Sequence, residues 1–195
     1  MTSKIYPDPT RGKKYFYWKD TYDFTTSFFN KNTHLKTGVE VGVAGGQNIK
    51  HICENCHHIE KLYGVDSYSQ DSFDMTHIDI NKEFGSFDLL FQEVKLMLSQ
   101  FDDRAQLIRK TSSDAVKEFS DESLDFIFLD ANHEFDSVYT DISNWFPKIK
   151  KRGIFMGHDW DHGNFPGVTK AVKKYFANKK IETVSEPYHI WYVVK

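Results

Sequence analysis

Acidic and histidine side chains stand at or near the ends of several apolar runs of this sequence. Carboxylates can orient a polar ligand or bind a divalent cation, and an imidazole can take up a proton near neutral pH. The apolar runs themselves predict short buried strands. If those strands are parallel, their carboxyl ends meet at one edge of a sheet, where ligands bind. The candidate side chains are Glu40, Asp66, Asp130, His133, His158 and Asp159.

The stretch 37–48 predicts how a ligand could approach the backbone at that edge. Residues 39–43 form an apolar run that is interrupted only by Glu40 and Gly42, and this run predicts a short buried strand. A turn almost without side chains follows, formed by Gly42, Ala44, Gly45 and Gly46. The next apolar residues recur at helical spacing, at Ile49, Ile52, Cys53 and Cys56. We therefore expect a strand, a tight turn and a helix whose first N–H groups point at a ligand.

This turn differs from the dinucleotide fingerprint G-x-G-x-x-G, because Ala44 and Gln47 stand where that pattern needs glycine. Glu40, two residues before Gly42, suits a ligand with an amine and a sulfonium better than a pyrophosphate. The stretch resembles motif I (E-x-G-x-x-x-G) of class I S-adenosylmethionine-dependent methyltransferases. A plain turn of another α/β fold is the alternative. The resemblance implies cofactor-binding roles for Glu40, Gly42, Ala44, Gly46 and Asn48.

Length and composition favour one globular domain. The 195 residues are 39% hydrophobic and 16% aromatic, which is ample for a core, and the net charge of −3 argues against a nucleic-acid partner. No apolar run of about 18 residues could span a bilayer, and the first residues do not resemble a signal peptide. With two cysteines, these features predict a cytoplasmic protein without a membrane partner. We expect residues 1–30 to form an arm or helix packed on a domain of residues 31–195.

The segment Cys53–His58 contains C-x-x-C-H, a pattern used for haem attachment and, with histidines, for zinc. Both cysteines lie on the apolar face of the expected helix, so we interpret them as core residues. Two other segments could lie near a ligand. The residues Lys14–Trp18 interleave basic and aromatic side chains that could stack on a base or sugar, but we expect them to pack over the domain. The polar loop 67–86 could form a lid on the substrate side.

Further along the chain, apolar runs alternate with helical patterns. The predicted strands are 62–66, 106–108, 124–129 and 154–156, followed by two consecutive strands at 181–184 and 190–194. A helix face runs from Phe135 to Ile149, a turn is expected at 150–153, and Pro166 and Gly167 open another helix. This order predicts an α/β fold with a Rossmann-like, doubly wound sheet. The methyltransferase resemblance implies a seven-stranded, mostly parallel sheet whose last strand is antiparallel.

Two strand ends would complete the cofactor site. Asp66 stands 24 residues after Gly42, and an acid at about that distance can bind both ribose hydroxyls. The alternative is a strand-end acid that caps a turn. Ser67, which follows Asp66 directly, and Asp130 are further candidate cofactor-binding residues. In the resembled family the end of the third strand lies against the adenine. That implies a hydrogen bond to the adenine edge from Ser112 or Ser113, at a predicted helix N-cap.

Three later segments, at 128–135, 153–160 and 165–172, resemble a subgroup of small-molecule O-methyltransferases that act on sugars (macrocin type) or, more distantly, on catechol. In its metal-dependent members an acid at the Asp130 position and two acids after the next strand bind a divalent cation. This chain has His158–Asp159 at the second place, so the implied site is Asp130, His158 and Asp159. Carboxylates suit Mg²⁺, and a histidine shifts the preference toward softer divalent metals.

These features predict an S-adenosylmethionine-dependent methyltransferase that modifies a hydroxyl of a small-molecule acceptor. Asn132 stands where some relatives have a second acid, and an amide cannot take up a proton. His133 beside Asp130 is then the expected catalytic base, although a structural histidine is the alternative. A non-catalytic cofactor-binding module and a nicotinamide-dependent oxidoreductase are the competing functions. The oligomeric state stays open, with a homodimer among the options.

Overall fold

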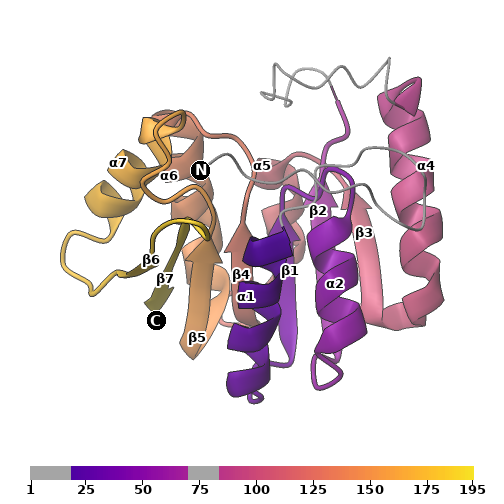
Figure 1. Ribbon diagram of the computed structural model, residues 1–195, viewed down its shortest axis with the longest axis horizontal. Coiled ribbons are helices and arrows are strands. Elements are labelled where there is room, and N and C mark those ends of the chain that lie inside the picture. The colour runs from indigo at the N-terminus through magenta and orange to yellow at the C-terminus, as the bar shows by residue number, and fades with distance from the viewer. Residues whose placement is uncertain (1–18, 70–83) are drawn as a thin grey trace.

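The computed structural model describes residues 19–69 and 84–195, and in them one sheet is flanked by helices on both faces (Figure 1). The strand order is β3-β2-β1-β4-β5-β7-β6, with β1 to β5 parallel to one another and β7 antiparallel to both β5 and β6. The predicted Rossmann-like fold class is confirmed. The strands are β1 (Thr37–Val41), β2 (Lys61–Asp66), β3 (Ala105–Arg109), β4 (Leu124–Leu129), β5 (Ile149–Gly157), β6 (Glu182–Val184) and β7 (Ile190–Val194).

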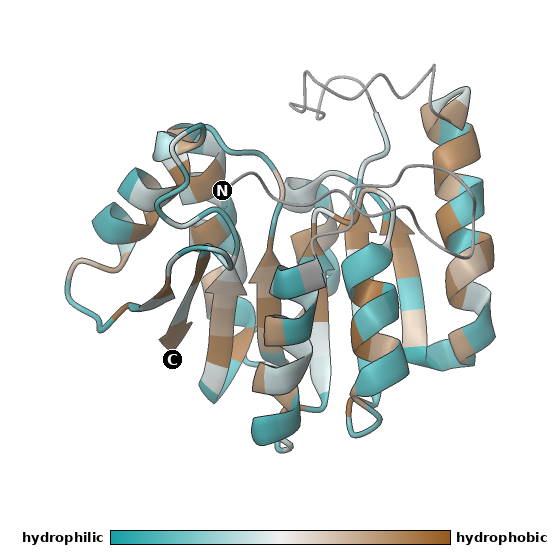
Figure 2. Ribbon diagram, viewed as in Figure 1, coloured by the Kyte–Doolittle hydropathy of each residue, from teal (hydrophilic) through white to brown (hydrophobic). Residues whose placement is uncertain are grey.

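Helices α1, α2 and α4 cover one face of the sheet, and α5, α6 and α7 cover the other (Figure 1). Alternation along β4 divides the core between them, because Phe126 and Phe128 face the first layer while Ile127 and Leu129 face the second. Figure 2 shows the apolar strands lying between helices whose outer faces are polar. The helices are α1 (Lys19–Lys31), α2 (Gln47–Asn55), α4 (Phe87–Leu98), α5 (Ser112–Ala115), α6 (Phe135–Trp145) and α7 (Pro166–Tyr175), with 3₁₀ turns at Ser99–Arg104, Val116–Glu118 and Phe146–Lys148.

The predicted apolar face of α2 is buried in the first core layer. Ile49, Ile52, Cys53 and Cys56 are all at most 1% exposed, and both thiols are free. The Cys56 thiol lies 3.6 Å from the carbonyl oxygen of Thr26 on α1. Burial raises the pKa of Cys53 to about 12 and that of Cys56 to about 11. The interpretation of these cysteines as core residues is confirmed.

Two predictions between α6 and β5 are wrong. Ile149 was expected on the helix face, but it opens β5, because Pro147 has no N–H with which to continue the helix. Residues 150–153 were expected to form a turn, but they continue β5 as an irregular strand. The pairing to β4 shifts from Leu124 with Ile149 to Phe126 with Ile154, which leaves extra residues on the β5 side.

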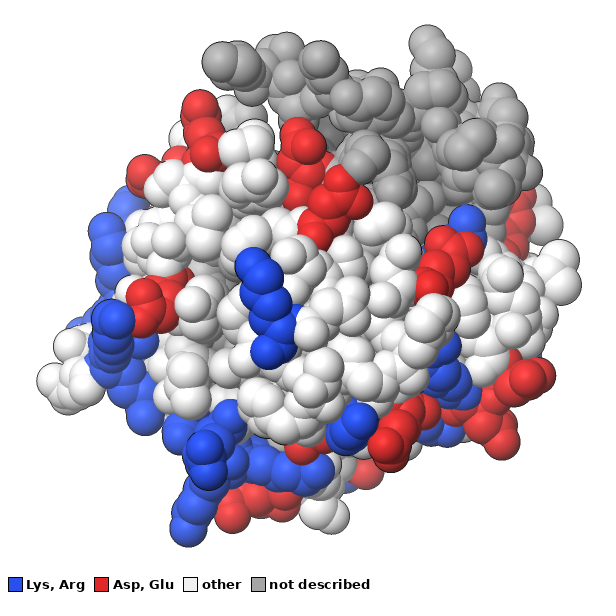
Figure 3. Space-filling model, turned by 60° about the horizontal axis from the view of Figure 1, so that its bottom comes forward, with Lys and Arg blue, Asp and Glu red and all other residues white. Residues whose placement is uncertain are grey.

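The segment Lys14–Trp18 and residues 70–83 of the expected lid loop lie outside the described residues. Within 19–69 and 84–195, no helix is both long and apolar enough to cross a membrane. On the face shown in Figure 3, acidic and basic side chains are interspersed around a largely uncharged centre.

Candidate functional site

The carboxyl ends of β2, β1, β4 and β5 are joined by backbone hydrogen bonds that continue the sheet beyond its strands. The N–H of Gly42 donates to the carbonyl of Val65 at 2.9 Å, and that of Asp130 donates to Val41 at 2.8 Å. The N–H of His158 donates to Leu129 at 3.1 Å. The first residue after β1, β4 and β5 is thereby fixed in register with its neighbour. The strand order, rather than any local motif, brings the candidate residues to one edge.

The glycine turn after β1 presses against the end of β4. Gly42 has a φ of 88°, and a Cβ atom there would lie 1.9 Å from the carbonyl oxygen of Asp130. Gly46, which precedes α2, has a φ of 76°, and Ala44 between them has a φ of 46°. This is the left-handed region that glycine tolerates best. The turn therefore presents backbone, with little side chain, at the edge of the sheet.

Asp66 stands at the end of β2 as predicted, and its carboxylate holds the glycine turn. One oxygen accepts from the N–H groups of Val43 at 3.0 Å and Ala44 at 2.9 Å, and the other accepts from Tyr68 at 2.8 Å. The Tyr68 hydroxyl donates to the carbonyl of Ala44 at 3.0 Å. Asp66 is thus a turn cap in this structure, as the alternative interpretation required. An ionised carboxylate offers about four acceptor positions, so three bonds do not exhaust it.

Behind the turn lies a pair of buried polar side chains. Glu40 is 3% exposed, and its Oε1 accepts a hydrogen bond of 3.0 Å from Nδ2 of Asn48. Three atoms here are buried without a partner among the described residues: Glu40 Oε2, Asn48 Oδ1 and Gln47 Nε2. Leaving such groups unpaired is costly, so they fit a ligand that brings both donors and acceptors.

Burial is the main reason that the pKa of Glu40 is raised to about 8, and the nearby carboxylates of Asp130 and Asp66 raise it further.

The unfolded chain releases the proton of Glu40 near the ordinary pKa of 4.5, whereas the folded chain keeps it up to about pH 8. Stability should therefore fall as the pH rises through this window, by at most about 1.4 kcal/mol per pH unit. Denaturant titrations between pH 5 and 8 should show a smaller fall for Glu40→Gln, and an equal fall in both proteins would contradict the assignment.

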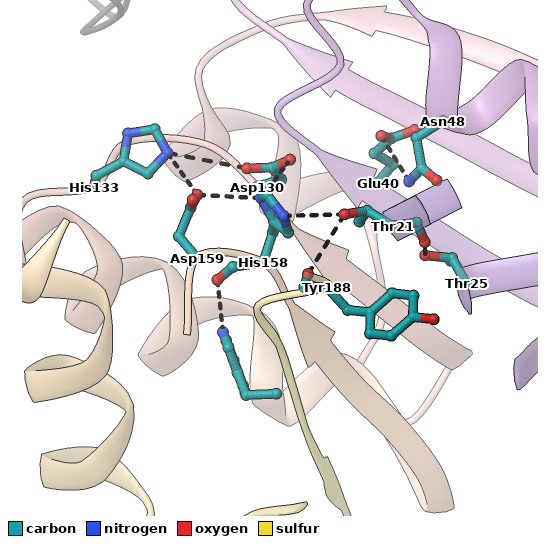
Figure 4. A network of polar contacts seen from close by, with 10 residues as sticks. Thr21, Thr25, Glu40, Asn48, Asp130, His133, His158, Asp159 and Tyr188 are labelled. Atoms are coloured by element: carbon teal, nitrogen blue, oxygen red, sulfur yellow. Dashed lines mark hydrogen bonds and ion pairs between the residues drawn. The ribbon is translucent and has the colours of Figure 1, made fainter. Parts of the chain in front are cut away.

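Asp130, His133, His158 and Asp159 form a second polar cluster after β4 and β5 (Figure 4). Nε2 of His133 lies 2.9 Å from Oδ2 of Asp159 and 4.0 Å from Oδ1 of Asp130. Nδ1 of His158 lies 3.4 Å from the carboxylate of Asp159 and 3.7 Å from that of Asp130. A small pocket opens at the cluster. Its polar lining residues are Asp130, Asn132, His133, His158 and Asp159.

The charges in this cluster support each other. Burial opposes a charge on His158, but the carboxylates of Asp159 and Asp130 outweigh it and raise the pKa of His158 well above its ordinary value. Burial also works against the charge on Asp159. The two histidines outweigh it and hold the pKa of that carboxyl far below its ordinary value. Asp159 is therefore a carboxylate at neutral pH.

Neighbouring residues hold the side chains and the backbone of the cluster in place. The ring of Phe165 stacks on His133 with centroids 4.0 Å apart, and Asn132 accepts from the N–H of Glu134 at 2.8 Å. The indole N–H of Trp191 donates to the carbonyl of His158 at 3.1 Å. Phe165 belongs to a segment that the sequence had singled out, but its contact with His133 could not be read from spacing. Thr21, whose hydroxyl lies 3.4 Å from Nε2 of His158, was missed because α1 is far away in the sequence.

The serines expected at the adenine lie at the start of α5. The Ser112 hydroxyl donates to Asp141 and accepts a hydrogen bond of 2.8 Å from the indole N–H of Trp145. Burial raises the pKa of Asp141 to about 6. Ser113 is exposed, and Ser67 pairs with Ser69 at 3.1 Å. The bonds of Ser112 serve the packing of α5 on α6. The adenine contact of Ser112 or Ser113 and the cofactor contact of Ser67 stay predictions.

Asp130, His133 and Asp159 offer ligand atoms that lie within 4.8 Å of one another, which is a candidate metal site. The site predicted from the sequence contains His158 in place of His133. In the structure the His158 ring stands between the carboxylates and Thr21, while His133 reaches both carboxylates from α6's preceding loop. Two carboxylates and an imidazole are a donor set that a divalent cation accepts.

The sheet order, the glycine turn after β1 and the acidic strand ends define a class I S-adenosylmethionine-dependent methyltransferase domain. A family model described as a methyltransferase domain matches residues 39–160, which is more than half of the chain. The chain belongs to this methyltransferase family. That assignment leaves no support for the nicotinamide-dependent alternative.

Several solved methyltransferases share the fold at low sequence identity. A proposed caffeoyl-CoA O-methyltransferase of Staphylococcus aureus has a TM-score of 0.66 at 15% identity, over 91% of this chain and 83% of that one. The calicheamicin methyltransferase CalS11 has a TM-score of 0.64 at 14% identity, over 91% of this chain and 79% of that one. An O-methyltransferase of Bacillus cereus, in complex with S-adenosylhomocysteine, has a TM-score of 0.60 at 12% identity, over 91% of this chain and 81% of that one. At these identities the likeness shows the fold.

An uncharacterised protein of Sinorhizobium fredii, y4gI, is 34% identical to this chain over 55 residues. The match covers 28% of this chain and 6% of that protein, so the chain spans a small part of this relative's length. It adds nothing about activity.

Proposed function

We propose that this protein transfers a methyl group from S-adenosylmethionine to a hydroxyl group of a small-molecule acceptor. The family supports methyl transfer, and the O-methyltransferases among the structures of similar fold favour oxygen as the acceptor atom. The observation that carries the proposal is the His133–Asp159 pair, 2.9 Å apart, at the same sheet edge as the glycine turn. With His133 as the base and the turn as the cofactor site, the two would lie at one edge of the sheet.

The residues around the turn suit the cofactor. An ammonium group would favour the ionised form of Glu40, so that the unpaired oxygens of Glu40 and Asn48 could accept from it. The turn at Gly42, Ala44 and Gly46, which carries little side chain, would lie along the methionine end. When bound, S-adenosylmethionine supplies an electrophilic methyl group on a sulfonium. Asp66 would bind the ribose and Ser112 or Ser113 the adenine edge. Ser67 and Asp130, at the ends of β2 and β4, are the remaining predicted cofactor contacts.

His133 would take the proton from the acceptor hydroxyl. Its Nε2 faces Asp159, and Figure 4 shows the other ring nitrogen pointing away from the two carboxylates. Asp159 would hold the ring in one orientation and stabilise the imidazolium that forms, as the carboxylate does in other acid–base pairs. Phe165, stacked on the ring, would restrict its rotation further.

A divalent metal at Asp130 and Asp159 is a second way to remove the same proton. Bound there, a cation would lower the pKa of the acceptor hydroxyl. The remaining ligand would come from His133 or His158, both of which lie within 4.0 Å of these carboxylates. If His133 were a ligand it could not serve as the base, so the two routes exclude each other at that residue. A chelator that abolishes turnover of the wild type would favour the metal route.

Asp66→Ala should weaken the binding of S-adenosylhomocysteine by tenfold or more, since the substitution removes both the ribose acceptor and the cap of the turn. Calorimetric titration gives the affinity, and thermal unfolding of the same sample shows whether the turn has loosened. Glu54→Ala, which removes an exposed carboxylate on α2, is the control. Unchanged affinity in Asp66→Ala would remove Asp66 from the ribose role.

Methylation of a hydroxyl can be tested with two acceptors. Caffeoyl-CoA is in the name of the Staphylococcus aureus protein, and TDP-rhamnose is in the description of an apo structure of CalS11. The purified chain is incubated with S-adenosylmethionine and each acceptor, and the formation of S-adenosylhomocysteine and the mass of the product are measured. A product heavier by one methylene supports the proposal and names the acceptor class. Tight cofactor binding without product from a wide panel of hydroxylated acceptors would favour the non-catalytic binding module.

A further inference from the structure

The N-terminal helix α1 reaches the active-site cluster through one buried hydroxyl. Thr21 is 3% exposed, and its Oγ1 lies 3.4 Å from Nε2 of His158 and 3.4 Å from the backbone carbonyl oxygen of Tyr188 (Figure 4). Ring contacts anchor α1 near this point. The ring centroids of Phe24 and Tyr188 lie 5.4 Å apart, and those of Phe29 and Phe126 lie 4.4 Å apart. The hydroxyl is therefore carried by a helix that packs on the domain on both sides of Thr25.

The hydrogen-bond directions follow from the chemistry of these groups. A carbonyl can only accept, so Thr21 donates its single proton to Tyr188. Towards His158 the same oxygen can then only accept, which requires a proton on Nε2. Nδ1 of His158 is turned to the other side, 3.4 Å and 3.7 Å from the carboxylates of Asp159 and Asp130.

We propose that Thr21 is a positioning residue of the active site: it orients the His158 ring so that Nδ1 faces Asp130 and Asp159. The inference rests on the proposed function for its catalytic consequence. Without the hydroxyl, the His158 backbone would stay in place through Trp191 and the Leu129 carbonyl, but the ring could turn about its side-chain bonds. The two carboxylates would lose a fixed neighbour, and Asp159 would hold His133 less well.

The helix supplies a matched control. Thr25 lies one turn further along α1, is fully buried, and donates to the carbonyl of Thr21 at 2.7 Å. Its replacement by valine makes the same isosteric change without touching His158. Thr21→Ser keeps the hydroxyl at the site, and Thr21→Ala provides a second variant without it if Thr21→Val fails to fold.

The test is a long-range ¹H–¹⁵N spectrum of the histidine side chains in the full chain, with His158 assigned by its loss in His158→Gln. Thr21→Val should move or broaden the Nε2 signal of His158, while Thr21→Ser and Thr25→Val should keep the wild-type signal. With an acceptor that supports turnover, Thr21→Val should lower kcat by about tenfold and leave the affinity for S-adenosylhomocysteine within about twofold.

A wild-type Nε2 signal in Thr21→Val, or an equal change in Thr25→Val, would overturn the inference. Normal turnover of a Thr21→Val protein with an altered signal would overturn its catalytic part. These outcomes are separate from the fate of the proposed function, because the spectrum needs neither cofactor nor acceptor. A wild type that binds no S-adenosylhomocysteine would reject the proposed function and leave the orientation of His158 measurable.

Discussion

Replacing His133 with alanine should lower the rate of methyl transfer by about 10²–10⁴-fold, the range that a general base contributes. Cofactor affinity should change little, because the ring contacts Asp159 and Phe165 and is not among the residues that we propose to bind the cofactor. Initial rates at saturating cofactor and a calorimetric titration with S-adenosylhomocysteine measure the two effects separately.

His57→Ala is a suitable control, since that histidine is exposed beyond the end of α2. Asp159→Asn should also lower the rate of methyl transfer. The variant with both substitutions should be scarcely slower than His133→Ala alone, because the two residues act as a unit. Full activity of His133→Ala would eliminate His133 as the base and leave the metal at Asp130 and Asp159 as the means of removing the proton.

Gly42→Ala should cost at least about 2 kcal/mol of stability and abolish cofactor binding. The φ of 88° is unfavourable for alanine, and the new Cβ would lie 1.9 Å from the Asp130 carbonyl oxygen, which belongs to the backbone and cannot move aside cheaply. The turn and the end of β4 would have to separate. Denaturant unfolding and titration with S-adenosylhomocysteine measure the two consequences.

Gly163→Ala is the matched control for this substitution, because a Cβ at that glycine would meet nothing within 4 Å. Its stability should stay within about 0.5 kcal/mol of the wild type. If Gly42→Ala were as stable as Gly163→Ala and bound the cofactor normally, the close approach of the turn to β4 would be refuted.

The fold could be predicted from the sequence because its strands are short, apolar and separated by clear helical patterns. The run Leu124–Leu129 is the most strand-like in the chain, and β4 has those bounds. Prediction failed at β5, because the sequence Lys-Lys-Arg-Gly at 150–153 is typical of a turn. The segment forms a bulge, in which Arg152 has a φ of 68°, and it is held at its two ends, where Ile149 pairs with Leu124 and Ile154 pairs with Phe126 and Val194.

The site was predictable only in part, for a related reason. Parallel strand ends share an edge, so Asp66, Asp130 and Asp159 could be placed together from the expected topology. The partner of each side chain depends on tertiary packing that spacing does not encode. Asp66 holds the backbone of the turn, and His133 pairs with Asp159 across 26 positions of the chain.

The most direct test of the proposed function is a calorimetric titration of the purified chain with S-adenosylhomocysteine, in the presence and absence of Mg²⁺ or Mn²⁺. We predict saturable binding in the micromolar range, about −8 kcal/mol. A change of affinity with the metal would implicate Asp130 and Asp159 as its ligands. Absence of binding to the folded chain under both conditions would contradict the assignment of the glycine turn as a cofactor site and, with it, the proposed methyl transfer.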